Sequence, residues 1–294
     1  MRLRTRRAPG EPGQEHPRLG EGYEPIAQLS RGNDFEVWDA WSIERGSRVI
    51  IKTLREDMLD DARKRERLMR EGTLLCDLTH PHIVRGYEVR GEPRPMVVME
   101  TLGGQTLSHM INVDGVLSDA EAAIVGLQVG AAVRYLHAKG YLHLDLKPSN
   151  VIAEAGRARL IDLGLSEPHG PIRAGVGTWC YLAPEQARGE GCGPAADVWG
   201  IGAMLFEALA GWPPFDEPGR ETNGVLDEHL EYPQLHRRAR PLAEASGAGA
   251  GLAALVDSCL DPGPGTRPSL TRLLGELEPL ADVPAAERRW AISG

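Results

Sequence analysis

The chain has 294 residues, of which 41% are hydrophobic, and a formal net charge of −9 at pH 7. This length allows one two-lobed domain or two small ones. The negative charge argues against nucleic acid or an anionic membrane as the main partner. The cysteines are widely spaced and form no C-x-x-C pattern, which indicates reduced thiols rather than a disulfide framework or a zinc site. Reduced thiols favour a cytoplasmic protein. No apolar run reaches about 18 residues, so we expect no membrane span.

The first seven residues carry four arginines, and Pro and Gly follow them. A basic start can serve as a targeting or lipid-binding arm, but no apolar segment follows the arginines as it would in a secretory signal. We therefore interpret residues 1–20 as a disordered basic arm. We expect one folded domain over residues 21–280 and a C-terminal tail over residues 281–294.

The first part of this domain predicts short strands and one helix. The helix extends from Asp60 to Leu78, with leucines on one face and basic residues on the other. The strands are rich in β-branched residues and are separated by Gly, Pro or charged residues. They cover Ile26–Leu29, Phe35–Trp41, Arg48–Thr53, Ile83–Val89 and Met96–Glu100.

Residues 101–275 predict mainly helices. Ser118 and Glu121 have the spacing of a capping box, which opens a helix that runs to His137 and stops near Gly140. The segment Asp197–Ala210 is apolar on nearly all sides, as expected for a helix in the middle of a lobe. Residues 220–251 are rich in Gly, Ala and charge and predict no definite element.

A polar loop from His143 to Asn150 carries the clearest chemistry. Asp145 can accept a proton from a hydroxyl group, Lys147 can neutralise a phosphate, and Asn150 can bind a hard cation through its amide oxygen. Asp162 follows an apolar strand and offers a second metal-binding carboxylate. These side chains suit the transfer of a phosphoryl group from a Mg-bound nucleotide to an alcohol.

This loop resembles the catalytic loop H-R-D-L-x-x-x-N of eukaryotic-type (Hanks-type) bacterial serine/threonine protein kinases, with Leu144 in place of the arginine. Other motifs similar to those of the family follow in the family's order: Asp162-Leu163-Gly164, Gly177-Thr178, Ala183-Pro184-Glu185, Asp197-Val198-Trp199-Gly200 and Arg267-Pro268. The resemblance implies that Arg267 bonds Glu185. The resemblance implies an α+β fold of two lobes. A small β-rich N-lobe with one helix would cover residues 21–101, and a larger, mainly helical C-lobe would cover residues 102–280.

The resemblance also implies a role for each polar residue. Lys52 and Glu71 would form an ion pair that holds the α- and β-phosphates of ATP, although a lysine that closes a buried strand can also be an edge residue. Asp145 would orient the substrate hydroxyl and accept its proton, and Lys147 would stabilise the transferring phosphoryl group. Asn150 and Asp162 would bind Mg²⁺. The other implied nucleotide contacts are Leu29, Ser30, Gly32, Val37, Ile50, Met99, Glu100, Leu102 and Ile152.

Several N-lobe residues depart from the family pattern. Ser30 and Phe35 replace glycines that let backbone N–H groups approach phosphate. Ile50 replaces a small residue against which adenine would lie, and Gly86 replaces a bulky apolar residue behind the helix. We expect these changes to weaken ATP binding. They also leave open a second interpretation, a pseudokinase that acts as a nucleotide-binding or scaffold module.

The substrate side of the resemblance favours serine and threonine over tyrosine, because Lys147 and Thr178 match the serine/threonine-specific pattern. We therefore expect protein substrates with Ser/Thr acceptors and a possible regulatory partner protein. Leu144 cannot bind a phosphate group as the missing arginine would. The segment Pro168–Val176 has no hydroxyl group to phosphorylate. Both observations predict activity that does not depend on phosphorylation of the activation segment, residues 162–185.

Overall fold

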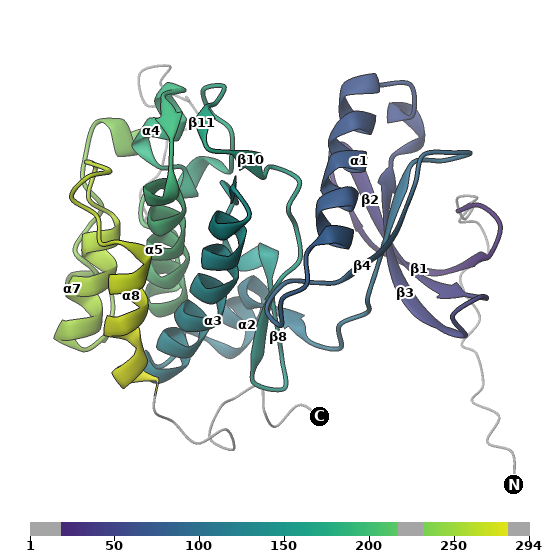
Figure 1. Cartoon of the computed structure of the whole chain (residues 1–294). Helices are drawn as coiled ribbons and strands as arrows, with labels where there is room; N and C mark the ends of the chain where they lie inside the picture. Colours follow the sequence, from purple (N-terminus) through teal and green to yellow (C-terminus); the bar gives the residue numbers. More distant parts are fainter. Residues whose placement is uncertain (1–18, 217–231, 282–294) are drawn as a thin grey trace, which may run out of the picture.

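The computed structural model describes residues 19–216 and 232–281, which fold into two lobes (Figure 1). The N-lobe contains an antiparallel sheet with strand order β1-β2-β3-β5-β4. Its strands are β1 (Tyr23–Arg31), β2 (Phe35–Ser42), β3 (Ser47–Leu54), β4 (Gly86–Arg90) and β5 (Met96–Met99). The predicted strands are confirmed, except that β4 begins three residues later than expected. Ile83 instead forms an isolated bridge with Leu160 of the C-lobe.

The N-lobe helix α1 (Ala62–Asp77) follows a short 3-10 turn, Glu56–Met58, and starts directly after Asp61. The Asp61 carboxylate caps the helix by accepting hydrogen bonds from the backbone N–H groups of Arg63 and Lys64. The buried face of α1 packs on β3, β4 and β5. A Cβ atom on Gly86 of β4 would lie 2.8 Å from backbone atoms of the helix. Glycine at this position therefore lets bare strand backbone rest against α1.

The C-lobe is mainly helical, as predicted. Its helices are α2 (Leu107–Asp114), α3 (Asp119–Ala138), α4 (Pro184–Arg188), α5 (Pro194–Ala210), α6 (Leu242–Ala245), α7 (Ala250–Cys259) and α8 (Leu270–Leu277). The capping box of Ser118 and Glu121 is present at the start of α3. Helix α5 is buried from Ala196 to Ala210 and packs against α3, α7 and α8 (Figure 1). It ends at Gly211, whose positive φ of 90° suits glycine.

Short strands place the polar loop between the lobes. The pair β8 (Val151–Glu154) and β9 (Arg157–Leu160) forms a sheet with β6 (Gln105–Thr106). Strand β7 (Tyr141–Leu142) pairs with β10 (Glu167–Pro168), and β11 (Gly170–Pro171) pairs with β12 (Gly191–Cys192). The remaining 3-10 turns are Pro148–Asn150, Trp179–Tyr181, Pro233–Leu235 and Glu278–Leu280. The polar loop from His143 to Asn150 thus lies between β7 and β8.

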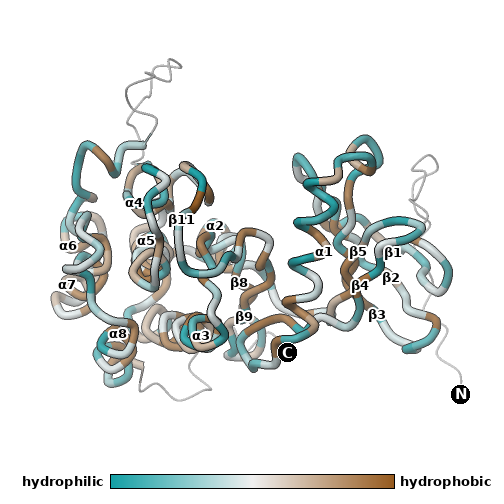
Figure 2. Tube along the Cα trace, turned by 45° about the horizontal axis from the view of Figure 1, so that its top comes forward, coloured by the Kyte–Doolittle hydropathy of each residue, from teal (hydrophilic) through white to brown (hydrophobic). Residues whose placement is uncertain are grey.

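One hydrophobic core extends through both lobes, and a smaller one covers the outer face of the N-lobe sheet. In Figure 2 hydrophobic stretches gather around β4 and β5, whereas hydrophilic stretches follow many outer loops. The smaller core includes Leu19, which is 1% exposed. The predicted disordered arm therefore overlaps the folded part at its last two residues. The rest of that arm, most of the predicted C-terminal tail and part of the unassigned segment lie outside the described residues. No helix in the described part is long and apolar enough to cross a membrane.

Candidate active site

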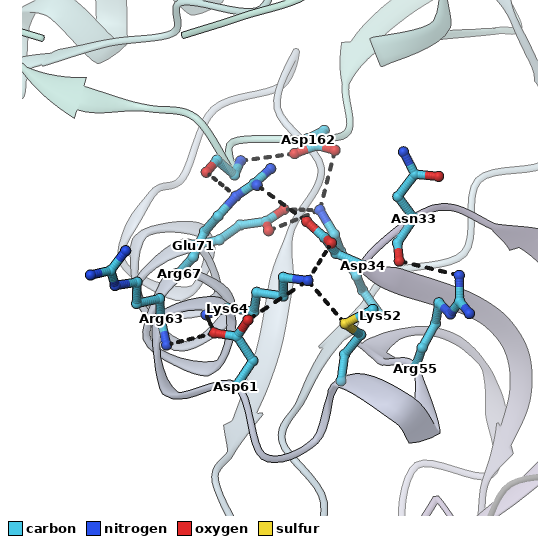
Figure 3. Close-up of polar contacts among 12 residues, drawn as sticks. Asn33, Asp34, Lys52, Arg55, Asp61, Arg63, Lys64, Arg67, Glu71 and Asp162 are labelled. Atoms are coloured by element: carbon cyan, nitrogen blue, oxygen red, sulfur yellow. Dashed lines mark hydrogen bonds and ion pairs between the residues drawn. The ribbon is translucent and has the colours of Figure 1, made fainter. Parts of the chain in front are cut away.

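A cluster of one ammonium and two carboxylates links the lobes, with Lys52 and Glu71 buried and Asp162 partly exposed (Figure 3). Lys52 extends from β3 and lies 2.8 Å from both carboxylate oxygens of Glu71 on α1. The same ammonium lies 3.2 Å from Oδ2 of Asp162 in the C-lobe. Lys52 is 6% exposed and Glu71 is 2% exposed. The predicted ion pair is therefore formed, and the predicted metal ligand Asp162 belongs to the same cluster.

The pKa values of Glu71 and Asp162 depend on burial and on the Lys52 ammonium that both carboxylates contact. Burial raises the pKa of Glu71 to about 7, against the lowering effect of the Lys52 ammonium. Burial alone would also raise the pKa of Asp162, but Lys52 and the backbone N–H of Gly164 hold it well below its usual range. Burial disfavours the charged form of Lys52, yet the two carboxylates raise its pKa overall. Asp162 thus stays ionised, and Glu71 is the group that takes up a proton most easily.

The Asp145 carboxylate is held by the side chains of Lys147, Asn150 and Thr178. Lys147 Nζ lies 2.8 Å from Asp145 Oδ2 and donates to Thr178 Oγ1 at 2.6 Å. The Thr178 hydroxyl donates to Asp145 Oδ1 at 2.6 Å. Asn150 Nδ2 donates to the Asp145 backbone oxygen at 2.9 Å and to Oδ2 at 3.1 Å. The sequence thus predicted a group of residues that the structure does bring together.

The loop before Asp145 has an unusual backbone that Asp197 holds in place. Leu144 has φ of +66°, a left-handed conformation that a leucine rarely adopts. The backbone N–H groups of His143 and Leu144 both donate to the Asp197 carboxylate at 2.8 Å, and His137 Nε2 lies 2.8 Å from it. Burial of Asp197 would raise its pKa, but the hydrogen bond to His137 and neighbouring charges lower it overall. A charged, buried acceptor thus fixes the turn that presents Asp145.

The turn between β1 and β2 lies against α1 and covers Lys52. Asp34 in this turn lies 2.9 Å from Lys64 Nζ and 3.9 Å from Arg67 Nη1 (Figure 3). The Phe35 ring centroid lies 5.1 Å from Lys52 Nζ and 5.3 Å from Arg67 Cζ. Arg67 Nε also donates to the backbone oxygen of Gly164 at 2.9 Å. The aromatic ring therefore occupies space beside the ammonium predicted to bind phosphate.

A cavity of about 500 Å³ opens next to this cluster. It is lined by Lys52, Asn150, Asp162 and most of the predicted nucleotide contacts: Leu29, Ser30, Val37, Ile50, Met99, Glu100, Leu102 and Ile152. Gly32 is not among the lining residues, and its N–H donates to the Phe35 backbone oxygen at 2.9 Å. Thr101 also lines the cavity, and its buried hydroxyl has no hydrogen-bond partner among the described residues. Thr101 was not predicted, because its place between Glu100 and Leu102 is its only distinguishing feature in the sequence.

Asn150 and Asp162 fit a magnesium ion. The Asn150 NH₂ group donates to Asp145 on one side, which leaves the amide oxygen as a ligand. Both residues line the cavity and offer oxygen atoms, the ligands that Mg²⁺ prefers. Within residues 19–216 and 232–281 no group of three or more His, Cys, Asp or Glu could hold a metal. Two protein ligands are typical of Mg²⁺ that takes its other ligands from water and nucleotide phosphates.

Comparison with known proteins decides the family. The model of the protein kinase domain matches residues 23–276. The chain belongs to the protein kinase family. The kinase is 33% identical over 290 residues to the serine/threonine-protein kinase PkaA of Streptomyces coelicolor, covering 90% of this chain and 51% of that protein. It is 31% identical over 262 residues to the serine/threonine-protein kinase PknB of Mycobacterium tuberculosis, covering 85% and 41%. It is 33% identical over 211 residues to PknB of Mycobacterium leprae, covering 68% and 34%. The aligned region thus spans about a third to a half of these relatives.

The family assignment confirms the predicted two-lobed kinase fold. The predicted pair of Arg267 and Glu185 is also formed, with two hydrogen bonds of 2.6 and 2.9 Å between buried side chains. The Arg267 guanidinium lies 5.0 Å from the ring centroid of Trp199 on α5. This contact fixes the end of the activation segment on the centre of the C-lobe.

Besides Thr101, two further residues of the site were not predicted from the sequence, Arg67 and Gln186. Arg67 lies on α1. It contacts the β1–β2 turn and the backbone oxygen of Gly164, the last residue of the motif that begins with Asp162. Gln186 Nε2 donates to the backbone oxygens of Leu144 and Val176, both at 2.9 Å. Nothing in a single sequence marks either residue, because their partners are distant along the chain. Both link the kinase's catalytic-type loop or metal motif to a neighbouring segment.

Proposed function

We propose that this chain is a serine/threonine protein kinase that transfers the γ-phosphoryl group of ATP to protein hydroxyl groups. The observation that carries this proposal is the assembled charged set: Lys52 is paired with Glu71 and Asp162, and Asp145 is paired with Lys147. Its kinase domain would cover residues 21–280, with the lobes meeting at residues 101 and 102. A non-catalytic scaffold would have no use for all of these paired charges together.

Each residue then has one role. Asp145 orients the acceptor hydroxyl and takes its proton, and Lys147 stabilises negative charge on the transferred group. Lys52 binds the nucleotide phosphates while Glu71 fixes its position. Mg²⁺, bound by Asn150 and Asp162, would neutralise phosphate charge. The chemistry depends on positioning and electrostatics more than on covalent catalysis.

The same arrangement supports activity without a phosphorylated activation segment. Lys52 and Glu71 are already paired, and Leu144, in place of a phosphate-binding arginine, is buried. Ser166 is 3% exposed, Thr178 is bonded to Asp145, and Tyr181 is bonded to Glu207. The hydroxyl groups of this segment are therefore all engaged or buried.

We further propose a cytoplasmic enzyme that acts on protein substrates under the control of a partner protein. Four free cysteines and the use of ATP support a reducing compartment. Net negative charge supports a partner other than nucleic acid.

The test is incubation of the purified chain with Mg²⁺, labelled ATP and a protein substrate, followed by mass spectrometry of the products. We expect phosphoserine and phosphothreonine, and their loss in Asp145→Asn. The matched control is Asp60→Asn, which removes an exposed carboxylate just before α1. A well-folded wild-type protein that transfers no phosphoryl group under these conditions would favour the pseudokinase alternative. The position of the Phe35 ring over Lys52 is the observation that supports this alternative.

A further inference from the structure

A small basic pocket of about 210 Å³ lies beside the segment that joins the lobes. Its walls come from the loop after α1, from Glu100, and from β9. Among the residues that line this pocket, only Glu100 also lines the large cavity described above. The pocket therefore adjoins the large cavity at Glu100 and shares no other lining residue with it.

Three arginines and one carboxylate line this pocket. Arg157 and Arg159 alternate along β9 with the fully buried Ala158 and Leu160, so both arginines lie on the same face of the strand. Arg85 reaches the pocket from the residue just before β4. Glu100 is the only acid among the lining residues. The lining thus carries two more positive charges than negative ones.

The single carboxylate is already fully engaged. Its Oε2 accepts a hydrogen bond from Arg159 Nη1 at 2.8 Å, and its Oε1 accepts the backbone N–H of Arg85 at 2.9 Å. The exposed guanidinium groups of Arg85 and Arg157 form no hydrogen bond or ion pair with the described residues. They are therefore free to bind a ligand from solvent.

The third arginine supplies an independent sign of a missing acceptor. The Arg159 Nε–H is buried and has no hydrogen-bond partner among the described residues. A buried N–H group without an acceptor is uncommon and costs free energy. This unsatisfied N–H group belongs to one of the three arginines that line the pocket.

We propose that this pocket binds a phosphate group, either free phosphate or the phosphoryl group of a phosphorylated side chain. Guanidinium groups bind phosphate through paired, charge-assisted hydrogen bonds, and three of them line the pocket. A tetrahedral phosphate is also small enough for this volume. The proposal does not rest on the kinase activity, because it concerns binding alone.

The test is a titration of the whole chain with inorganic phosphate, followed by two-dimensional NMR of backbone amide signals. We expect residues 79–85 and 157–159 to shift. Arg85→Gln and Arg157→Gln should each weaken phosphate binding about tenfold, the effect expected for one charge-assisted contact. Arg63→Gln is the matched control, because this exposed arginine on α1 points away from its neighbours (Figure 3) and should bind phosphate like the wild type.

Two further arms locate the site and the source of the phosphate. Lys52→Met should keep wild-type phosphate affinity, because the large cavity is not involved. A phosphoserine peptide that binds more tightly than inorganic phosphate would identify a phosphorylated side chain as the ligand, and equal affinity would identify free phosphate. The proposal is overturned if both arginine variants titrate like the wild type, if Lys52→Met loses binding, or if the unphosphorylated peptide binds as well as its phosphorylated twin.

Discussion

At the scale of single residues, Leu144 shows how the site holds an unfavourable backbone. A left-handed conformation at a residue other than glycine costs on the order of 1–3 kcal/mol. The two hydrogen bonds from His143 and Leu144 to Asp197 offset that cost. Asp145 directly follows Leu144. The strained backbone of Leu144 and its acceptor Asp197 therefore both determine where the Asp145 carboxylate points.

Asp197→Asn should therefore lower both stability and turnover. The substitution replaces one acceptor oxygen by an NH₂ group that faces a backbone N–H. We expect the free energy of unfolding to fall by about 1–3 kcal/mol, the cost of a buried unsatisfied donor. Urea unfolding and the labelled-ATP assay measure the two effects, with Asp60→Asn as the control. Wild-type values in both experiments would mean that Asp197 does not hold the turn.

Glu71 makes a prediction about pH. Its pKa rises from an ordinary value of 4.5 to about 7 on folding. Between these values the folded protein binds a proton that the unfolded chain has lost, so Glu71 makes the free energy of unfolding fall as pH rises. Relative to Glu71→Gln, the wild type should lose up to about 1.4 kcal/mol per pH unit in this window. Denaturant unfolding at several pH values tests this, and parallel curves for the two proteins would contradict it.

At the scale of elements, α1 is linked to the two segments it must position. Arg67 contacts the Phe35 ring and the Gly164 backbone oxygen, and Arg70 lies 2.7 Å from Glu167 of β10. Asp34 pairs with Lys64 one turn earlier. These contacts join the helix that carries Glu71 to the β1–β2 turn and to the activation segment without any phosphate.

Arg67→Ala should reduce turnover about tenfold, which corresponds to about 1.4 kcal/mol in the barrier. The loss should appear mainly in kcat, because Arg67 positions the metal motif and contacts no proposed substrate. Arg63→Ala is the matched control on the same helix, since its guanidinium points away from the cluster (Figure 3). Equal kcat values for the two variants would remove Arg67 from the positioning network.

The β1–β2 turn makes a prediction about ATP affinity. The Phe35 ring lies beside the Lys52 ammonium, and Ile50 lines the cavity. Phe35→Gly combined with Ile50→Ala should open both places and tighten ATP binding. Calorimetric titration of the wild type and the double variant measures the difference. The idea of crowding fails if the double variant binds ATP no more tightly than the wild type.

At the scale of the whole molecule, local sequence patterns predicted much of the fold, whereas contacts between residues far apart along the chain were not predicted. The capping box at Ser118, the apolar α5 and the pair Arg267–Glu185 follow from short motifs or from the family resemblance. Arg67 bonds a residue 97 positions away, and Gln186 bonds one 42 positions away. Such partners are fixed only when the lobes and the activation segment come together, so the sequence alone could not reveal them. Leu19 was missed for the same reason, because its burial depends on the N-lobe sheet.

The joined lobes also predict how the proposed kinase activity responds to phosphatase. The activation segment is held by Arg67, Arg70 and Gln186, none of which needs a phosphorylated partner. Complete dephosphorylation should therefore change turnover by less than about tenfold, or about 1.4 kcal/mol. The measurement is an assay started directly after phosphatase removal, before the protein can label itself again. A larger drop would show that phosphate contributes after all.

Gly86 sets a limit on how far α1 can move inward. The helix rests on strand backbone at this residue, with no side chain between them. A side chain between two elements can change rotamer and absorb a small displacement, whereas backbone against backbone cannot. Glu71 lies one turn before the contact, so the separation of α1 from the sheet, and with it the reach of Glu71 toward Lys52, has a hard lower bound. Gly86 thus allows the closest approach of α1 to the sheet. Even one added methyl group at this position would push the helix outward.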